Sequence, residues 1–242
     1  MGRFAISLLV TGALCAVIGL DTAVQASSPY LAPSASPVPC PVVETPLARG
    51  SRASPAQVGT GGRVEAPTAG FALTLPDGWL WVATESSDIE ALSALVIETD
   101  AERGPVVAEL LSALPCTHTY LFDLVAVAPL REDGPVAETC TVGVSHATGE
   151  SIEDILEMNT VPVIALGGEA TITNPVDLPG GSAGRVDSAQ MFGVETVGDV
   201  VHYGSRYFWL DDGRQAMLSC LDVQPHADHW RSIAETFEFP TR

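Results

Sequence analysis

One short segment of the sequence has the residue pattern of a serine nucleophile. Gly-Gly-Ser182-Ala-Gly fits G-x-S-x-G, and Asp222 followed by His226 or His229 completes the chain order Ser, Asp, His. A nucleophile elbow requires a strand before the serine and a helix after it. Here a proline-rich segment precedes the serine and a strand-like pattern follows it. The pattern therefore favours a turn, and a serine hydrolase using Ser182 is kept as an alternative.

Two histidines near the C-terminus could bind a divalent metal. His226 and His229 are three residues apart, which places both on one face of a helix, and Asp222 lies nearby. Structural zinc takes four ligands, and the sequence does not identify the rest of the set. A solvated first helical turn, with Asp228 near its N-terminus, explains the same residues. A metal site at His226, His229 and Asp222 is therefore a second alternative, and we expect no cofactor.

The cysteines predict disulfides and not a metal knuckle. No two cysteines have C-x-x-C spacing, and four of them follow the first 26 residues, namely Cys40, Cys116, Cys140 and Cys220. An even number in an exported chain favours disulfides, with three possible pairings. If residues 119–128 and 138–145 pair as a hairpin, Cys116 lies too far from Cys140 to bond it. Cys220 then bonds Cys116 or Cys140, and Cys40 bonds the remaining one.

Residues 1–26 have the pattern of a secretory signal peptide. Arg3 precedes an apolar stretch, residues 4–20, and Val24-Gln-Ala26 provides small residues at a cleavage site. An uncleaved membrane anchor is the alternative, although the stretch is slightly short for a span. No second apolar run is long enough to cross a bilayer. The sequence thus predicts a secreted or cell-envelope protein with no integral membrane segment after cleavage.

The composition excludes several classes of function. The chain has 242 residues and a net charge of −19, which repels phosphate backbones, so we expect no nucleic-acid partner. All 11 basic residues are arginines, so Schiff-base catalysis and a P-loop lysine are excluded. A hydrophobic fraction of 46% with 17% charged residues is typical of a globular chain.

The chain divides into three segments. After the signal, residues 27–69 are rich in Pro, Ser, Ala and Gly, which predicts a flexible linker. Residues 70–240 are enough for one globular domain. Its expected strands are 71–75, 79–82 after a Pro76-Asp-Gly78 turn, 119–128, 138–145, 169–173, 184–192, 200–210 and 214–223. Its expected helices are 89–96, 105–114, 152–158 and 225–237.

The strongest local signal is a hairpin at Asp211-Asp-Gly213. The three residues suggest a calcium loop, but they lack its spaced ligands, so a hairpin turn is favoured. With Asp212-Gly213 as the turn, Trp209 faces Ala216, Tyr207 faces Leu218 and Phe208 faces Met217. Both faces are then apolar, which predicts an α+β fold whose antiparallel sheet is covered by helices on both faces.

Three motifs, in their order along the chain, resemble the PsbP-like family, including its bacterial exported members. They are Phe71-Ala-Leu-Thr-Leu-Pro-Asp-Gly-Trp79, Leu178-Pro-Gly-Gly-Ser-Ala-Gly-Arg185, and Trp209–Cys220 followed by Trp230–Pro240. The resemblance covers about residues 70–240 and implies an antiparallel sheet between helical layers. It also implies a non-catalytic accessory subunit or binding module, because the family shares no catalytic motif.

We therefore expect an exported, non-enzymatic binding or accessory module with a protein or small-molecule partner outside the cytoplasm. Trp79, Trp81, Trp209 and Trp230 could line a ligand groove, but aromatic residues at strand ends are more often core anchors.

Overall fold

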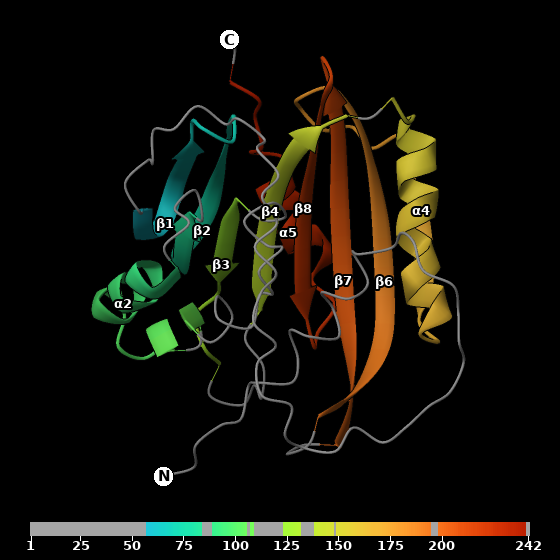
Figure 1. The fold of residues 1–242 in the computed structure, drawn as a ribbon. Helices are drawn as coiled ribbons and strands as arrows, with labels where there is room; N and C mark the ends of the chain where they lie inside the picture. The colour runs from blue at the N-terminus through green and yellow to red at the C-terminus, as the bar shows by residue number, and fades with distance from the viewer. Residues whose placement is uncertain are drawn as a thin grey trace, which may run out of the picture.

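The structure is a computed structural model that describes residues 57–83, 89–105, 107–108, 123–131, 138–147, 149–194 and 198–240 (Figure 1). The predicted signal peptide, residues 27–56 of the predicted linker, Cys40 and Cys116 lie outside these residues, as do residues 109–114 of a predicted helix and residues 119–122 of a predicted strand. Among the helices of the described residues, none combines the length and the apolar character needed to cross a membrane.

The fold is one antiparallel sheet of eight strands with helices packed against it, which confirms the α+β prediction (Figure 1). The strand order is β1-β2-β3-β4-β8-β7-β6-β5. The strands are β1 (Gln57–Ala66), β2 (Phe71–Ala83), β3 (Leu124–Val127), β4 (Thr139–His146), β5 (Glu169–Thr173), β6 (Ser182–Val194), β7 (Gly198–Asp211) and β8 (Arg214–Asp222). The helices are α2 (Ile89–Thr99), α4 (Ile152–Ala165) and α5 (Ala227–Ala234).

The predicted flexible linker is wrong for its last part, which contains the first strand of the sheet. Residues Gln57–Ala66 form β1 and pair with β2, whereas the sequence predicts a flexible segment up to residue 69. The strand is held by backbone pairing, and only Val64 and Ala66 bury their side chains. A glycine-rich strand of this kind has little apolar alternation, which is the signal that sequence patterns detect.

The second strand corrects the predicted turn at Pro76-Asp-Gly78. Residues Phe71–Ala83 form one continuous strand, because β1 pairs with both of its halves. The pairing register shifts between Thr60 and Gly62, where the four residues Pro76–Trp79 of β2 lie opposite Gly61 alone, so the turn residues form part of a bulge in β2. Gly61 has φ 58°, and a Cβ there would lie 2.9 Å from the carbonyl oxygen of Pro76. The close approach of the two backbones therefore requires glycine at this position.

The capping box predicted at Ser151 and Asp154 is confirmed. The Ser151 side chain accepts from the Asp154 backbone N–H, and the Asp154 carboxylate accepts from the Ser151 backbone N–H. The helix continues to Ala165, beyond the predicted end at residue 158 and across Pro162. Leu156 and Val163 are fully buried, so packing against the sheet outweighs the loss of one helical hydrogen bond at the proline.

The β7–β8 hairpin has the predicted register. Trp209 pairs with Ala216, Tyr207 with Leu218 and Phe208 with Met217. Asp212 and Gly213 have φ values of 43° and 72°, as a two-residue turn with two left-handed positions requires. The calcium-loop alternative for this segment is therefore not needed to explain its residues.

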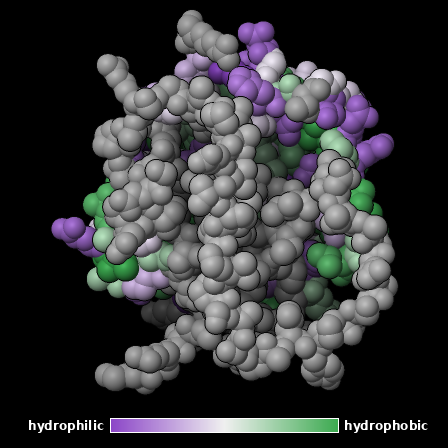
Figure 2. Space-filling view, in the orientation of Figure 1, coloured by the Kyte–Doolittle hydropathy of each residue, from purple (hydrophilic) through white to green (hydrophobic). Residues whose placement is uncertain are grey.

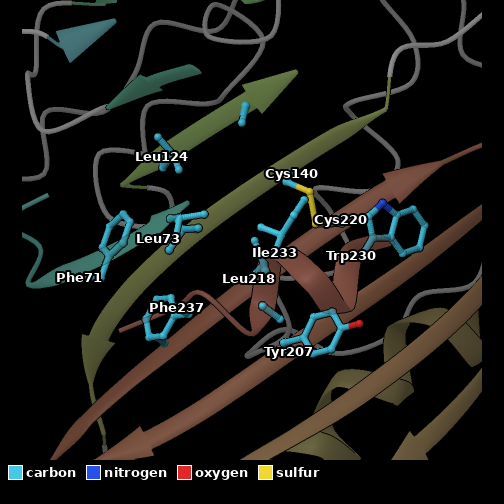
Figure 3. Close-up of a cluster of buried hydrophobic side chains, with 14 of the residues drawn as sticks. Phe71, Leu73, Leu124, Cys140, Tyr207, Leu218, Cys220, Trp230, Ile233 and Phe237 are labelled. Carbon is cyan, nitrogen blue, oxygen red and sulfur yellow. A yellow bond between two sulfur atoms is a disulfide. The ribbon is translucent and has the colours of Figure 1, made fainter. Parts of the chain in front are cut away.

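Three hydrophobic clusters join the helices to the sheet. The largest contains Tyr207 and Trp209 from β7 with Trp230 and Ile233 from α5 (Figure 3). A second contains Leu92 and Val96 from α2 with Leu80, Val82, Val125 and Val127 from the sheet, and a third contains Leu156 from α4 with Val186 and Phe208. Hydrophobic residues also reach the surface beside hydrophilic ones (Figure 2). Met158, Val161 and Ile164 of α4 are exposed hydrophobic residues.

A disulfide joins the two central strands. Cys140 of β4 lies directly opposite Cys220 of β8, and their Cα atoms are 4.1 Å apart (Figure 3). This pair is one of the two that the sequence left open for Cys220. The remaining pair, Cys40 with Cys116, lies outside the described residues.

Candidate functional site

The disulfide fixes a pair of carboxylates at one end of the sheet. Thr139 pairs with Leu221, so Glu138, the residue before β4, faces Asp222, the last residue of β8. Each carboxylate lies two residues from a bonded cysteine. Because side chains alternate along a strand, both carboxylates project on the same face as the disulfide.

Asp222 is the buried centre of this group. Its side chain is 0% exposed, and its Oδ1 accepts hydrogen bonds from Arg131 Nη2 at 2.5 Å and from the Val223 backbone N–H at 2.6 Å. Its Oδ2 lies 2.9 Å from His226 Nε2 but accepts no hydrogen bond from the described residues. Oδ1 is therefore paired with an arginine, whereas Oδ2 has the His226 imidazole beside it.

The start of α5 brings two histidines to the same place. His226 is the N-cap residue and makes no side-chain capping hydrogen bond, and its Nε2 also lies 3.2 Å from Arg131 Nη1. His229, one turn later, has its Nε2 3.8 Å from Glu138 Oε1. The predicted common helical face of the two histidines therefore points toward the carboxylates.

Glu138 is held by a tryptophan of the core. Trp230 Nε1 donates to Glu138 Oε1 at 2.6 Å, and the Trp79 ring lies 5.9 Å from the His229 ring. One ligand atom each from Glu138, Asp222 and His226 lie within 4.8 Å of one another. We call Arg131, Glu138, Asp222, His226 and His229 the Asp222 cluster.

The structure brings together Asp222 and His226 of the predicted metal site, whose Oδ2 and Nε2 atoms are 2.9 Å apart. His229, the third predicted residue, lies near Glu138 and is not one of the three residues whose ligand atoms lie within 4.8 Å of one another. Sequence analysis missed two members, Glu138 and Arg131, which come from segments far from the histidines. For Glu138, a signal exists in the sequence: Glu138 and Asp222 each lie two residues from a cysteine. This spacing predicts that the two carboxylates are neighbours only once Cys140 is known to pair with Cys220. Asp228 is exposed in the first turn of α5, as predicted for a solvated residue.

A further histidine lies near the cluster but is buried. His202 of β7 is 1% exposed. Burial lowers the pKa of His202, and this effect outweighs the nearby Asp222 carboxylate, which raises it. His202 is therefore neutral at pH 7. His146, at the end of β4, is exposed.

The residues of the hydrolase alternative are not brought together. Ser182 begins β6 and faces Leu210, which in turn faces Gln215 at the turn end of β8. Asp222 lies seven residues further along β8, or about 23 Å at about 3.3 Å per residue. The glycines before Ser182 form a turn and a strand follows them, as predicted.

The tryptophans are mostly core anchors and not a groove lining. Trp79, Trp209 and Trp230 are each at most 2% exposed. Trp209 stacks on Phe237 with ring centroids 4.3 Å apart, and its Nε1 donates to the Pro179 carbonyl oxygen. Trp81 is partly buried against the same cluster.

Comparison with known proteins finds similar folds but no close relative. No protein-family model matches the chain, and no curated protein matches it. Cyanobacterial PsbP (CyanoP) from Synechocystis sp. PCC 6803 is 14% identical, with a TM-score of 0.43 over 75% of this chain and 93% of that chain. LpqN, described as involved in cell envelope biogenesis of Mycobacterium tuberculosis, is 13% identical, with a TM-score of 0.42 over 77% of this chain and 93% of that one.

A third solved structure comes from Bacteroides thetaiotaomicron VPI-5482. It is 11% identical, with a TM-score of 0.41, and the match covers 76% of this chain and 50% of that one. This chain thus spans half the length of that protein. PsbP is the family that the sequence motifs resemble, and the likeness to all three structures is one of fold alone.

Proposed function

We propose that the chain is an extracytoplasmic, non-enzymatic binding or accessory module whose binding site is the Asp222 cluster. The observation that carries this proposal is the state of Asp222, a fully buried carboxylate with one oxygen that accepts no hydrogen bond from the described residues. Buried charges are normally paired and hydrogen-bonded on all sides. An incompletely neutralised one, placed beside partly exposed histidines, marks a place where a ligand can bind.

The chemistry of the site supports binding more than catalysis. The cluster contains carboxylates, imidazoles and a guanidinium, but no hydroxyl or thiol nucleophile. Ser182, the candidate nucleophile, lies at the other end of the hairpin. A serine hydrolase needs its base within hydrogen-bond reach of the serine, so the arrangement favours a non-catalytic role.

Two features support a location outside the cytoplasm. The Cys140–Cys220 disulfide is typical of oxidising compartments, and residues 1–26 have the pattern of a signal peptide. We infer that the module acts as a secreted or cell-envelope protein with a protein or small-molecule partner there.

We also infer that helices cover both faces of the sheet. Side chains that alternate along β7 belong to different clusters, Tyr207 and Trp209 with α5 and Phe208 with α4. This α/β/α arrangement is the one that the family resemblance implies, and it leaves the end of the sheet at Asp222 as a place for ligands.

The proposal is tested by two measurements on the full chain. A fluorophosphonate probe should leave Ser182 unlabelled, and stoichiometric labelling of Ser182 would overturn the non-enzymatic assignment. Chemical cross-linking in the native envelope should capture a partner with the wild type and with Asp228→Asn. The double variant Glu138→Gln, His226→Gln should lose that partner, and a partner kept by the double variant would place the binding site elsewhere.

A further inference from the structure

The disulfide holds two like charges against each other. Glu138 and Asp222 face one another across β4 and β8, next to the Cys140–Cys220 bond. Like charges directly opposite in an antiparallel pair are destabilising. Arg131 donates to Oδ1 of Asp222, whereas Oδ2 accepts no hydrogen bond from the described residues. Among the described residues of the cluster, two carboxylates accompany one arginine, which is an excess of negative charge when both histidines are neutral.

His226 lies between two neighbours that make opposite hydrogen-bonding demands on its Nε2. Its Nε2 lies 2.9 Å from Asp222 Oδ2 and 3.2 Å from Arg131 Nη1. A protonated Nε2 suits the carboxylate but opposes the N–H of the arginine. An unprotonated Nε2 accepts from the arginine, but its lone pair then faces the carboxylate. Neither tautomer satisfies both neighbours.

We propose that Glu138, Asp222 and His226 bind one divalent transition-metal cation of the zinc class, with His229 as a fourth ligand. The inference rests on the proposed function, for which it names the ligand. Imidazole nitrogen and carboxylate oxygen are ligands that zinc accepts. A cation among them takes the free lone pair of Asp222 Oδ2 and that of His226 Nε2 at once, and it screens the two carboxylates from each other.

The dimensions of the cluster suit this ion. Ligand atoms around tetrahedral zinc lie roughly 3.4 Å apart, since each is about 2.1 Å from the metal. In the structure one atom each from Glu138, Asp222 and His226 lie within 4.8 Å of one another, and His229 Nε2 is 3.8 Å from Glu138 Oε1. His229 completes the set only when its side chain, which is 40% exposed, rotates toward the other three ligands.

Arg131 competes with the cation for the same charge. Its guanidinium donates to Asp222 Oδ1, and its side chain is 28% exposed. A metal ion and a guanidinium that share one carboxylate repel each other. Arg131 therefore weakens metal binding, and its removal should strengthen it. If the cluster were only a structural network of ion pairs, removal of Arg131 would not be expected to increase its affinity for zinc.

The test is a zinc titration of the full chain with oxidised disulfides, purified without a His tag. Isothermal titration calorimetry with zinc chloride should show one ion per chain. Glu138→Gln and His226→Gln should each weaken binding at least about tenfold. Arg131→Gln should tighten it by about tenfold, the size of effect that a neighbouring unit charge has on a bound proton.

Matched controls come from residues of the same types outside the cluster. Asp228→Asn on α5 and His146→Gln at the end of β4 should leave the zinc affinity within about twofold, a change too small for loss of a ligand. The ligand variants are at partly exposed positions, so circular dichroism should show them folded. Asp222→Asn is less suitable because that side chain is fully buried.

Three results would overturn the inference: no stoichiometric zinc on the folded wild type, equal losses in the controls and the ligand variants, or weaker binding by Arg131→Gln. Failure here is distinct from failure of the proposed function. A chain that binds no zinc but loses its envelope partner in Glu138→Gln, His226→Gln still has its binding site at the Asp222 cluster.

Discussion

An aspartate lies at each end of strand β8, because Asp211 of β7 faces Arg214, its first residue, and Asp222 is its last residue. The charge is neutralised in different ways at the two ends. At the turn end, Arg214 Nη2 bonds Asp211 Oδ2 at 2.9 Å, and the arginine also lies over the Phe239 ring at 4.3 Å. The Asp211 side chain is 40% exposed. Asp211 and Arg214 pair within a single turn, and water screens the exposed Asp212 beside them.

At the other end of β8, the charges come from distant segments and do not balance. Asp222 is 0% exposed and faces Glu138, while Arg131 reaches only one of its oxygens. The comparison distinguishes two roles of aspartate residues, one exposed and one buried. A turn aspartate serves local structure, whereas carboxylates collected from separate strands and kept from water need a further partner.

The largest expected effect comes from removing the bond that holds the carboxylates together. The double variant Cys140→Ser, Cys220→Ser should lose about 4 kcal/mol of unfolding free energy, since the bond closes a loop with a sequence separation of 80. Urea unfolding measures the loss, with the reduced wild type as control. Hydrogen exchange should quicken at Thr139 and Leu221 more than at the hairpin turn. Unchanged stability would show that the strand register alone holds Glu138 against Asp222.

The next effect concerns the buried aspartate itself. Asp222→Asn should destabilise the metal-free protein by about 2 kcal/mol, because Arg131 then loses the carboxylate that accepts its hydrogen bond. Relief of the repulsion with Glu138 offsets only part of this cost. Urea unfolding in the presence of a chelator measures it. A stabilised variant would mean that the repulsion outweighs the ion pair.

A smaller effect is expected at the turn end. Gly213 has φ 72°, and no atom lies within 4 Å of a Cβ built there. Gly213→Ala should therefore cost about 1 kcal/mol from the backbone conformation alone. Thermal unfolding measures this cost, and zinc affinity should be unchanged. A loss of zinc binding in this variant would show that the two ends of β8 are coupled.

The sequence predicts the turn end well because its signals are local. Asp212-Gly213 between two apolar runs determines the turn, the turn determines the register, and the register determines which aromatic residues face each other. The first strand was missed because Gln57–Ala66 buries only Val64 and Ala66 and depends on β2 for its hydrogen bonds. Such a strand has no pattern of its own to detect.

The cluster at the other end could be predicted only in part. Asp222, His226 and His229 lie close in sequence, and helical spacing joins the histidines. Glu138 and Arg131 join them only through the pairing of β4 with β8, which depends on the choice among cysteine pairs. Once Cys140 is placed opposite Cys220, strand alternation puts Glu138 beside Asp222. The missing information was therefore a single long-range pairing.

The smallest expected effect is the matched change at the turn aspartate. Asp211→Asn should cost less than about 0.5 kcal/mol, because the ion pair with Arg214 is partly exposed and confined to one turn. Arg214 keeps its contact with the Phe239 ring, so the loss of the carboxylate does not leave the guanidinium unsupported. Urea unfolding at low and at high salt should show that even this small cost shrinks as salt rises. If Asp211→Asn cost as much as Asp222→Asn, burial would not be what distinguishes the two ends of β8.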